Sequence, residues 1–341
     1  MLKHPCMSPR RVIIALIALS AACAANSPPD ETTGSPSASS PSASNDNDTP
    51  DAATPLWTSD AAPLSFPTAD GGPLSDCASG AGSFIYVISD ANDLYTFDPT
   101  QFPSAAAFTL VGPVTCDASG VNSMAVDRSA TAWVNFNDGA IYKVTTTAPV
   151  TCTPTSFVAG QGGFTGVLGM GFAVDAPGGN TETLFVSDNA GPGGTCNASS
   201  PGPSCTGKGL GTIDLSSMTL TPRGAYTGAA VGFNAELTGT GDGRLFGFFT
   251  TTPASYGPID TATGATSTPA PTSIPSVNAA TGGYAFSFWG GDFYFYTAPK
   301  NKTVVTHLAS ATGATTASPQ LTFTIVGAGV STCAPTTAPV K

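Results

Sequence analysis

The sequence predicts an all-β protein, a β-propeller of five four-stranded blades, with six blades as the alternative. Three observations predict this fold class. Glycine and proline account for 39 and 30 of the 341 residues, which is typical of many short strands joined by turns. A strand–turn–strand unit recurs along the chain, and its repeat length of about 50 residues is typical of propeller blades. No segment shows the apolar periodicity of an amphipathic helix.

Residues 1–22 are predicted to be a signal peptide. Arg10 and Arg11 precede the apolar run Val12–Leu19, which is too short to cross a bilayer as a stable helix. The stretch Leu19–Cys23 resembles a bacterial lipobox, and this resemblance implies cleavage before Cys23 and attachment of diacylglycerol to its thiol. The alternative is ordinary cleavage at an Ala-x-Ala site near Cys23, which would give a soluble secreted protein.

Residues 23–76 are predicted to be the lipidated cysteine followed by a disordered tether. The segment is rich in Ser, Pro and Asp and has almost no aliphatic residues, so it cannot bury enough apolar area to offset the entropy lost on ordering. Such a composition suits a spacer that holds a folded domain away from a membrane. The propeller is predicted over residues 77–336, and a short tail over residues 337–341.

The second strand of each predicted blade is the clearest part of the repeat. These strands begin at residues 84, 131, 183, 244 and 292, in steps of 47, 52, 61 and 48, and the longest step coincides with an insertion. Their apolar residues are consecutive, as expected where neighbouring blades cover both faces of a strand. The aromatic residues of segment 285–298 are therefore predicted to be core and not a ligand platform. The five strands are Phe84–Ser89, Thr131–Phe136, Thr183–Ser187, Arg244–Thr250 and Asp292–Thr297.

The two ends of the propeller are predicted to complete one blade. Phe108–Cys116 and Phe323–Cys333 have similar sequences and look like the same fourth strand. The first unit lacks a clear first strand, so one terminus is expected to complete a blade that the other terminus begins. Because ring closure places Cys333 near Cys77, we predict a disulfide between them.

The cysteine count supports a disulfide framework. Of the eight cysteines, Cys6 lies in the removed segment and Cys23 is lipidated, which leaves six, an even number. Six cysteines allow many pairings. Besides Cys77–Cys333 we predict Cys196–Cys205, which closes a small loop in the insertion, and Cys116–Cys152 by elimination. Because disulfides persist outside the cytoplasm, we expect an exported outer-membrane or cell-surface lipoprotein of the cell envelope. The alternative location is secreted or periplasmic and soluble.

The charge distribution disfavours one class of partner. The net charge is −11, and no Lys or Arg occurs between Arg11 and Arg128. A nucleic-acid-binding protein needs a basic surface to displace the counterions of phosphates. We therefore expect no nucleic-acid partner.

Two segments resemble a known propeller family. SMAVDRSATAWV (residues 123–134) and GFAVDAPGGNTETLFV (residues 171–186) resemble the strand–turn–strand signature of NHL-like and related lyase- or lactonase-type propellers. The chain as a whole is similar to a bacterial lipoprotein family in which a lipobox, a Ser/Pro linker and an NHL-like β-propeller follow in order. The resemblance covers about Cys77 to Pro335. It implies a propeller fold and says almost nothing about function, because propellers host many unrelated activities.

Few residues could carry catalysis. His307 is the only histidine of the predicted mature chain, which argues against multi-histidine metal sites and against lyase-type propellers with a catalytic histidine. We interpret it as an ordinary strand residue. The oxygen-bearing side chains of Asp90, Asn92 and Asp93 alternate in a way that weakly indicates calcium, although hairpin turns use the same residue types.

A carboxylate near the propeller axis is the most specific polar candidate. Glu236 lies within the apolar first strand Ala235–Gly239, and first strands lie nearest the axis. Asp127 and Asp175 end equivalent first strands, so they either face the propeller mouth with Glu236 or form structural turns.

The first functional hypothesis is a non-catalytic binding or interaction module, held at a membrane through its lipid anchor, whose ligand is an unknown protein or glycan. No cofactor is required. The alternative is a calcium-dependent hydrolase or lactonase that uses axial carboxylates such as Glu236. A purely structural surface protein is the third hypothesis.

Overall fold

The computed structural model describes residues 76–189, 207–267, 270–271, 274 and 282–339. The predicted signal peptide, Cys23, all of the tether except Asp76, and the Cys196–Cys205 pair lie outside these residues. Most of the insertion between the second and third strands of the third blade, residues 190–206, also lies outside them.

The fold is a five-bladed β-propeller, as predicted, and each blade is a four-stranded antiparallel sheet. The alternative of six blades is wrong. Ordered from the innermost to the outermost strand, the blades are as follows: blade 1, β20 (Ile325–Gly329), β1 (Ile85–Ser89), β2 (Asp93–Phe97) and β3 (Phe108–Pro113); blade 2, β4 (Val121–Val126), β5 (Thr131–Phe136), β6 (Ile141–Thr145) and β7 (Cys152–Pro154); blade 3, β8 (Leu168–Val174), β9 (Glu182–Asp188), β10 (Leu210–Asp214) and β11 (Thr219–Gly224); blade 4, β12 (Ala235–Gly239), β13 (Leu245–Phe249), β14 (Ser255–Ile259) and β15 (Ala270–Pro271); blade 5, β16 (Tyr284–Trp289), β17 (Asp292–Thr297), β18 (Val304–Leu308) and β19 (Thr315–Ala317).

The helical segments of the described residues are single 3-10 turns in the connections. None of these helices is long and apolar enough to cross a membrane. They are η1 (Pro99–Gln101), η2 (Ala105–Ala107), η3 (Gln161–Gly163), η4 (Gly228–Ala230) and η6 (Pro299–Asn301).

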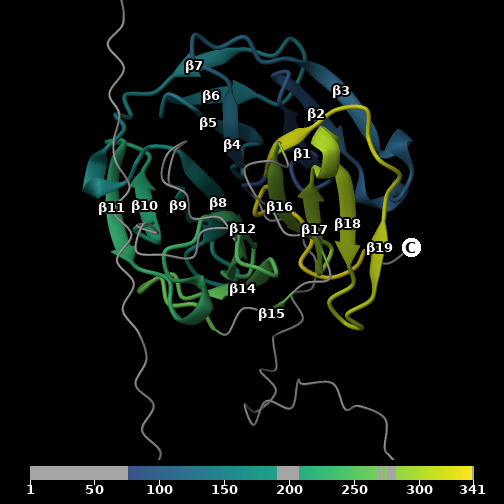
Figure 1. The fold of residues 1–341 in the computed structure, drawn as a ribbon. Helices are drawn as coiled ribbons and strands as arrows, with labels where there is room; N and C mark the ends of the chain where they lie inside the picture. Colours follow the sequence, from purple (N-terminus) through teal and green to yellow (C-terminus); the bar gives the residue numbers. More distant parts are fainter. Residues whose placement is uncertain (1–75, 190–206, 268–269, 272–273, 275–281, 340–341) are drawn as a thin grey trace, which may run out of the picture. The chain divides into compact units, whose positions relative to one another are not determined.

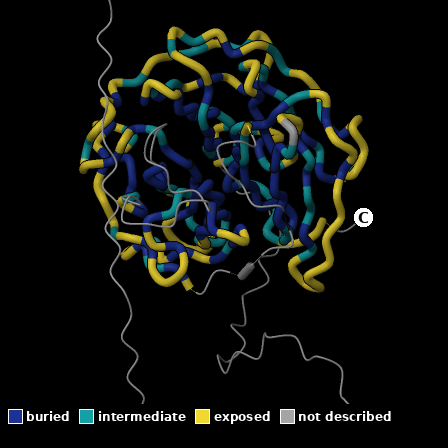
Figure 2. The backbone as a smooth tube through the Cα atoms, in the orientation of Figure 1, coloured by how far each residue is buried: buried dark blue, intermediate teal, exposed yellow. Residues whose placement is uncertain are grey.

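The innermost strands form a closed circle. β4 contacts β8 and β20, β12 contacts β8 and β16, and β16 contacts β20. Figure 1 shows the five sheets arranged around this common centre. Every residue of β8, β12 and β13 is buried, whereas exposed residues concentrate on the outer strands and connections (Figure 2). This gradient explains the consecutive apolar residues of the inner strands, because a neighbouring blade covers each face.

The C-terminal strand closes the ring in a different position from the one predicted. β20 is the innermost strand of blade 1 and pairs antiparallel with β1, whereas the similar segment Phe108–Pro113 forms the outermost strand β3. The prediction that both are fourth strands is therefore wrong. The glycines of β20 explain its place, because a Cβ on Gly327 or Gly329 would lie 3.1 Å or 3.0 Å from the backbone of β4. Only a strand with glycines can approach its neighbour so closely.

Two disulfides are present among the described residues, and both pairs are ones that the sequence predicts. Cys77–Cys333 joins the two ends of the propeller, with 6.0 Å between the Cα atoms. Cys116–Cys152 joins the connection that follows β3 to β7, so it links the outer edges of blades 1 and 2. Disulfides of this kind indicate that the chain folds in an oxidising compartment, outside the cytoplasm.

The aromatic segment 285–298 is core. Phe286, Phe293 and Phe295 are each at most 6% exposed, and they lie in β16 and β17 against the rings of blade 4. Tyr296 is also buried, but it packs against Phe97 of blade 1. The rings therefore fill the spaces between blade 5 and its two neighbours, as predicted for core residues, and are not presented to a ligand.

Candidate functional site

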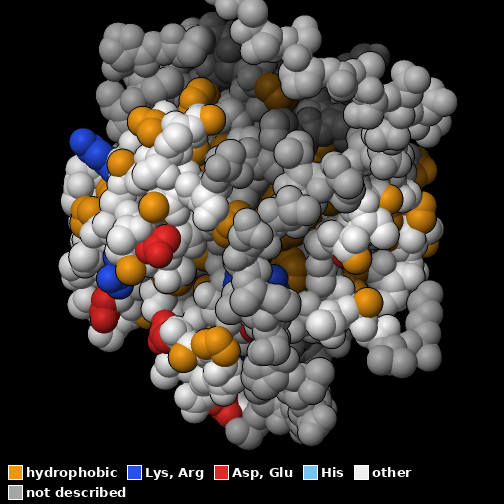
Figure 3. Space-filling model, turned by 90° about the horizontal axis from the view of Figure 1, so that it is seen from below, with side chains coloured by type: hydrophobic (Ala, Val, Ile, Leu, Met, Phe, Trp, Pro, Cys, Tyr) orange, Lys and Arg blue, Asp and Glu red, His pale blue; other side chains and the backbone are white. Residues whose placement is uncertain are grey.

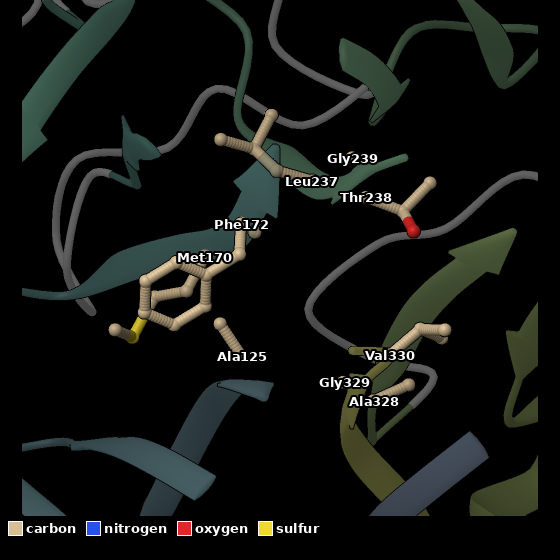
Figure 4. Close-up of a pocket in the computed structure, with 10 residues that line it drawn as sticks. Ala125, Met170, Phe172, Leu237, Thr238, Gly239, Ala328, Gly329 and Val330 are labelled. Atoms are coloured by element: carbon tan, nitrogen blue, oxygen red, sulfur yellow. The ribbon is translucent and has the colours of Figure 1, made fainter. Parts of the chain in front are cut away.

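The middle of the propeller axis is filled rather than open. A Cβ on Gly239 would lie 2.1 Å from the Phe172 carbonyl oxygen, and one on Gly171 would lie 3.1 Å from Leu237. The space between these strands is too small to hold a water molecule. Figure 4 shows that side chains from β4, β8 and β12 and the residues around the end of β20 surround it. A ligand cannot pass along this axis, so binding must involve one end of the ring or its rim.

A buried polar cluster occupies one end of the axis. We term this the start end, because the innermost strands begin there, and the opposite end the finish end. Glu236, the second residue of β12, is 3% exposed. The Ser123 hydroxyl of β4 donates a hydrogen bond to its Oε2 (2.6 Å), and the Asn189 amide after β9 donates to its Oε1 (3.4 Å). Glu236 thus links blades 2, 3 and 4 at the axis.

A glycine makes room for this contact. β8 lies between β4 and β12 in the ring, and its residue nearest the cluster is Gly169. A Cβ there would lie 2.0 Å from the Ala235 carbonyl oxygen and 3.2 Å from the Asn189 amide nitrogen. Any side chain at this position would displace β12 or the amide, so the short separation between Asn189 and Glu236 depends on glycine.

Burial of the axial carboxyl group favours its neutral form. Burial raises the pKa of Glu236 well above its ordinary value, and the hydrogen bonds from Ser123 and Asn189 offset only part of this rise. A charged carboxylate here would lack a buried cation to pair with, which would be costly in a water-poor interior.

Two tyrosine hydroxyl groups lie near Glu236 without a hydrogen-bond partner. Tyr226, between β11 and η4, and Tyr284, the first residue of β16, both have buried hydroxyl oxygens that no donor or acceptor reaches. Burial is the main cause that raises the pKa of each tyrosine, and the charge of an ionised Glu236 would raise both further. Ser187 is close enough to lower the pKa of Tyr226 in part, but the two hydroxyls do not reach hydrogen-bond geometry.

Side-chain oxygens near the start end join four of the five pairs of neighbouring blades through hydrogen bonds. Asn92 Oδ1 accepts a hydrogen bond from the backbone N–H of Val121 (3.3 Å), the first residue of β4. Three further oxygens do the same for the first residues of β8, β12 and β20: Asn135 Oδ1 for Leu168 (2.9 Å), Asn189 Oδ1 for Ala235 (3.1 Å) and Thr303 Oγ1 for Ile325 (2.7 Å). These contacts between blades were not predicted from the sequence. Asn92 and Asn189 follow second strands and Asn135 lies within one, which was a visible signal, whereas Thr303 precedes the third strand β18.

The calcium candidates of the β1–β2 turn have structural contacts. Asn92 accepts one of the hydrogen bonds between blades just described, and its φ of 63° places it in the left-handed region that asparagine tolerates. The backbone N–H of Asp93 donates to Ser89 Oγ (3.1 Å), and the backbone N–H of Asp90 donates to the Thr324 carbonyl oxygen (2.9 Å). The side chain of Asn92 thus has a structural role, whereas the contacts of Asp90 and Asp93 involve only their backbone N–H groups.

The donor set at the axis does not fit calcium. Ca²⁺ prefers about six to eight oxygen ligands that include ionised carboxylates. At the start end burial raises the pKa of Glu236 and so disfavours its ionised form, and backbone N–H groups donate to the side-chain oxygens of Asn135 and Asn189. No three His, Cys, Asp or Glu side chains gather in metal-binding geometry within the described part of the chain.

Asp127 and Asp175 do not join Glu236. They follow the last residues of β4 and β8, at the finish end, whereas Glu236 lies near the start of β12. Asp127 Oδ1 accepts from the backbone N–H groups of Ser129 and Thr131 (both 2.9 Å), and Asp175 accepts from the Thr183 hydroxyl (2.7 Å). Both are turn carboxylates, so the prediction that they share one axial site with Glu236 is wrong.

His307 lies away from the axis. It is in β18, the third strand of blade 5, opposite Tyr294, and its Nε2 is 2.8 Å from Asp292 Oδ2. No serine hydroxyl among the described residues hydrogen-bonds to this histidine, so the pair is not part of a nucleophile–base arrangement. It is a strand residue, as interpreted from the sequence.

Replacing Glu236 by Gln is expected to change how stability depends on pH. Because the native pKa lies above the unfolded value near 4.5, the native state keeps a proton that the unfolded chain loses as the pH rises. The free energy of unfolding of the wild type should therefore fall between pH 4.5 and the native pKa, by up to about 1.4 kcal/mol per pH unit. Glu236→Gln should lack this component. Urea unfolding at a series of pH values measures it.

The difference between the two proteins isolates Glu236. Burial also raises the pKa of Glu182, but Glu182 is present in both and its contribution cancels. Curves of stability against pH that run parallel for wild type and variant would contradict the neutral axial carboxyl group.

Comparison with known proteins gives only remote likeness. No family model matches the chain, and no curated protein matches it. Solved β-propeller structures that it resembles include the Dos1 propeller (TM-score 0.32, 10% identity, covering 65% of this chain and 53% of that one), TolB from Acinetobacter baumannii (0.36, 14%, 70% and 53%) and AztD from Citrobacter koseri (0.35, 8%, 72% and 96%). The chain spans about half of the length of the first two. The five-bladed architecture rests on the strand pairing of the chain itself.

Proposed function

We propose that this protein is an envelope-anchored lipoprotein whose β-propeller is a non-catalytic binding domain. The observation that carries this proposal is the filled axis, together with the use of the Asn135 and Asn189 side-chain oxygens for hydrogen bonds between blades. A ligand would therefore contact the ends or the rim of the ring, where connections between strands are exposed.

A polar ligand such as a cell-wall glycan suits this surface best. The exposed large hydrophobic residues among the described residues are Leu110, Val158 and Val231, which belong to different blades or connections. Where described residues are visible in Figure 3, hydrophobic side chains form small groups. A protein-docking face would be expected to present a larger continuous apolar patch.

The hydrolase or lactonase alternative has less support. Such an enzyme would need carboxylate and amide oxygens that are free to hold Ca²⁺ or to act as a base. Burial disfavours the ionised form of Glu236, which accepts a hydrogen bond from Ser123, and the Asn189 side chain is hydrogen-bonded to Ala235 and Glu236. The cluster is better suited to holding blades together than to proton transfer.

The binding proposal is tested with the full chain, extracted in detergent, and purified peptidoglycan sacculi. We expect saturable co-sedimentation that EDTA leaves unchanged, and equal binding by Glu236→Gln, because the axial cluster is not the contact surface. Hydrolysis of model lactones that requires Ca²⁺ and is lost in Glu236→Gln would contradict the proposal and favour the enzyme.

The anchor is tested separately by metabolic labelling with palmitate. Wild type should incorporate the label and fractionate with membranes, and Cys23→Ser should do neither. If Cys23→Ser still incorporates palmitate, Cys23 is not the lipidated residue; if wild type is unlabelled and soluble, the alternative of a secreted protein holds.

A further inference from the structure

A cavity of about 190 Å³ lies between the outer strands of blades 2 and 3 and opens to solvent. These two blades are neighbours in the ring (Figure 1). The walls of the cavity come from β6, from β7 with the residues that follow it, and from the turn between β10 and β11. Because a water molecule takes about 30 Å³ in the liquid, the cavity has room for roughly six waters or for a single sugar ring.

Strand register places one cation on the wall that blade 2 contributes. Lys143 of β6 lies directly opposite Trp133 of β5 on one side and Thr153 of β7 on the other. Opposite residues of antiparallel strands share a face of the sheet, and on this face Trp133 packs against Phe172 of blade 3 (6.3 Å between ring centroids). The side chains of Lys143 and Thr153 are therefore turned toward blade 3, and both line the cavity.

The charge of Lys143 is available to a ligand. Its ammonium nitrogen lies 4.6 Å from the centre of the Trp133 ring, and it forms no ion pair within the described part of the chain. The residues that line the cavity include no Asp or Glu, although the chain as a whole has a net charge of −11. A cavity with one cation and no carboxylate favours a negatively charged ligand group.

The rest of the lining suits a sugar ring. Ser156 and Ser216 are exposed and present hydroxyl groups, while Leu215 and Met218 offer apolar surface to the C–H groups of a ring. The Ser216 hydroxyl donates to Asp214 Oδ1 (2.6 Å), so its oxygen can accept a hydrogen bond from a sugar hydroxyl. Apolar side chains with a few placed polar groups are typical of small-molecule sites.

Hydrogen bonds hold the walls of the cavity in place. Gln161, in the connection between β7 and β8, donates from Nε2 to the Met218 carbonyl oxygen (3.0 Å) and accepts at Oε1 from the Leu220 N–H (3.0 Å). On the opposite wall the Thr155 hydroxyl donates to the Ile141 carbonyl oxygen (2.7 Å). Because the walls are already ordered, binding a ligand costs little conformational entropy.

We propose that this cavity binds one sugar unit of a glycan through a carboxylate that pairs with Lys143. The inference rests on the proposed function and deepens it, because it names the site on the rim and the charge of the ligand. The cavity is smaller than the roughly 300 to 1,000 Å³ of pockets for larger ligands. A single unit therefore enters it, and the rest of the glycan stays outside.

Titration of the full chain in detergent with two sugars tests the proposal. N-acetylmuramic acid carries a carboxylate on a lactyl ether, and N-acetylglucosamine is the same ring without that group. Wild type should bind the acidic sugar about tenfold more tightly, because a hydrogen bond to a charged group contributes at least this much. Lys143→Gln should bind both sugars equally. Ligand-observed NMR measures the affinities, and equal affinity of wild type for the two sugars, or binding of neither, would overturn the proposal.

Further variants separate this contact from a general loss of charge. Lys302→Gln removes another exposed lysine, from blade 5, and should keep the tenfold preference. Ser156→Asp places a negative charge in the cavity and should abolish the preference, whereas Ser156→Asn should keep it. A preference lost in Lys302→Gln, or kept in Ser156→Asp, would contradict the site even if Lys143→Gln failed to fold.

Co-sedimentation with sacculi tells this inference apart from the proposed function. Full binding of sacculi by Lys143→Gln and Ser156→Asp would overturn the inference and leave the binding proposal intact. If the acidic sugar binds but sacculi do not, the inference holds and the cell-wall ligand of the proposed function fails. Treating sacculi with an amidase, which removes the peptides and frees the sugar carboxylates, should strengthen binding. Weaker binding after this treatment would place the recognised carboxylate on the peptide and overturn the inference.

Discussion

Replacing Cys77 and Cys333 together by alanine should lower the free energy of unfolding by about 5.5 kcal/mol, against about 3.8 kcal/mol for Cys116 and Cys152. The difference follows from loop length. The first bridge joins residues 256 positions apart and the second joins residues 36 positions apart, and a longer closed loop removes more entropy from the unfolded chain. Urea unfolding of the two double variants under oxidising conditions measures the difference of about 1.7 kcal/mol.

The Cys77–Cys333 bridge should also have a local effect on the strand β20. Cys333 follows β20, the strand that enters blade 1 from the C-terminal end, so the bridge holds the last strand in the ring. Hydrogen exchange of the β20 amides should accelerate more in Cys77→Ala/Cys333→Ala than in Cys116→Ala/Cys152→Ala. An equal loss of stability in the two variants, with no faster exchange in β20, would contradict a locking role.

The second strands and the disulfides could be predicted because their signals are local or arithmetic. A strand covered on both faces must be apolar on consecutive residues, and Phe293 and Phe295 carry that signal without any knowledge of the neighbouring blade. The pairing of Cys77 with Cys333 followed from ring closure. By contrast, the similar sequences of segments 108–113 and 325–329 predicted the same strand position in the blade. The glycines of the second segment explain why it is the innermost strand instead.

The sequence predicts Glu236 near the axis, but its partners Ser123 and Asn189 could not be predicted, because these residues are far apart in the sequence. Ser123 and Glu236 are 113 residues apart, and neither segment carries a sequence signal that their side chains are in contact. The same limit explains Asn92. A turn, a metal site and a hydrogen bond between blades all use asparagine oxygens, and only the position of Val121 in the fold distinguishes them.

Replacing Phe295 by alanine should lower the free energy of unfolding by about 3 to 5 kcal/mol. Phe295 is fully buried in β17, and its ring centroid lies 5.0 Å from those of Phe248 and Phe286 and 5.3 Å from that of Tyr256. Rings of both blades surround it, so the cavity left by alanine cannot be filled by a small shift of one side chain. Chemical unfolding measures the loss.

A phenylalanine of the other aromatic cluster of blade 5, which packs against blade 1, is the control. Phe102 is only partly buried, so Phe102→Ala should cost about 1 kcal/mol, because half-exposed rings lose less on truncation. The comparison decides the role of the aromatic residues. If they hold two blades together, Phe295→Ala must lose far more stability than Phe102→Ala while binding to sacculi persists in the folded fraction. If they were a ligand platform, Phe295→Ala would retain its stability and lose binding instead.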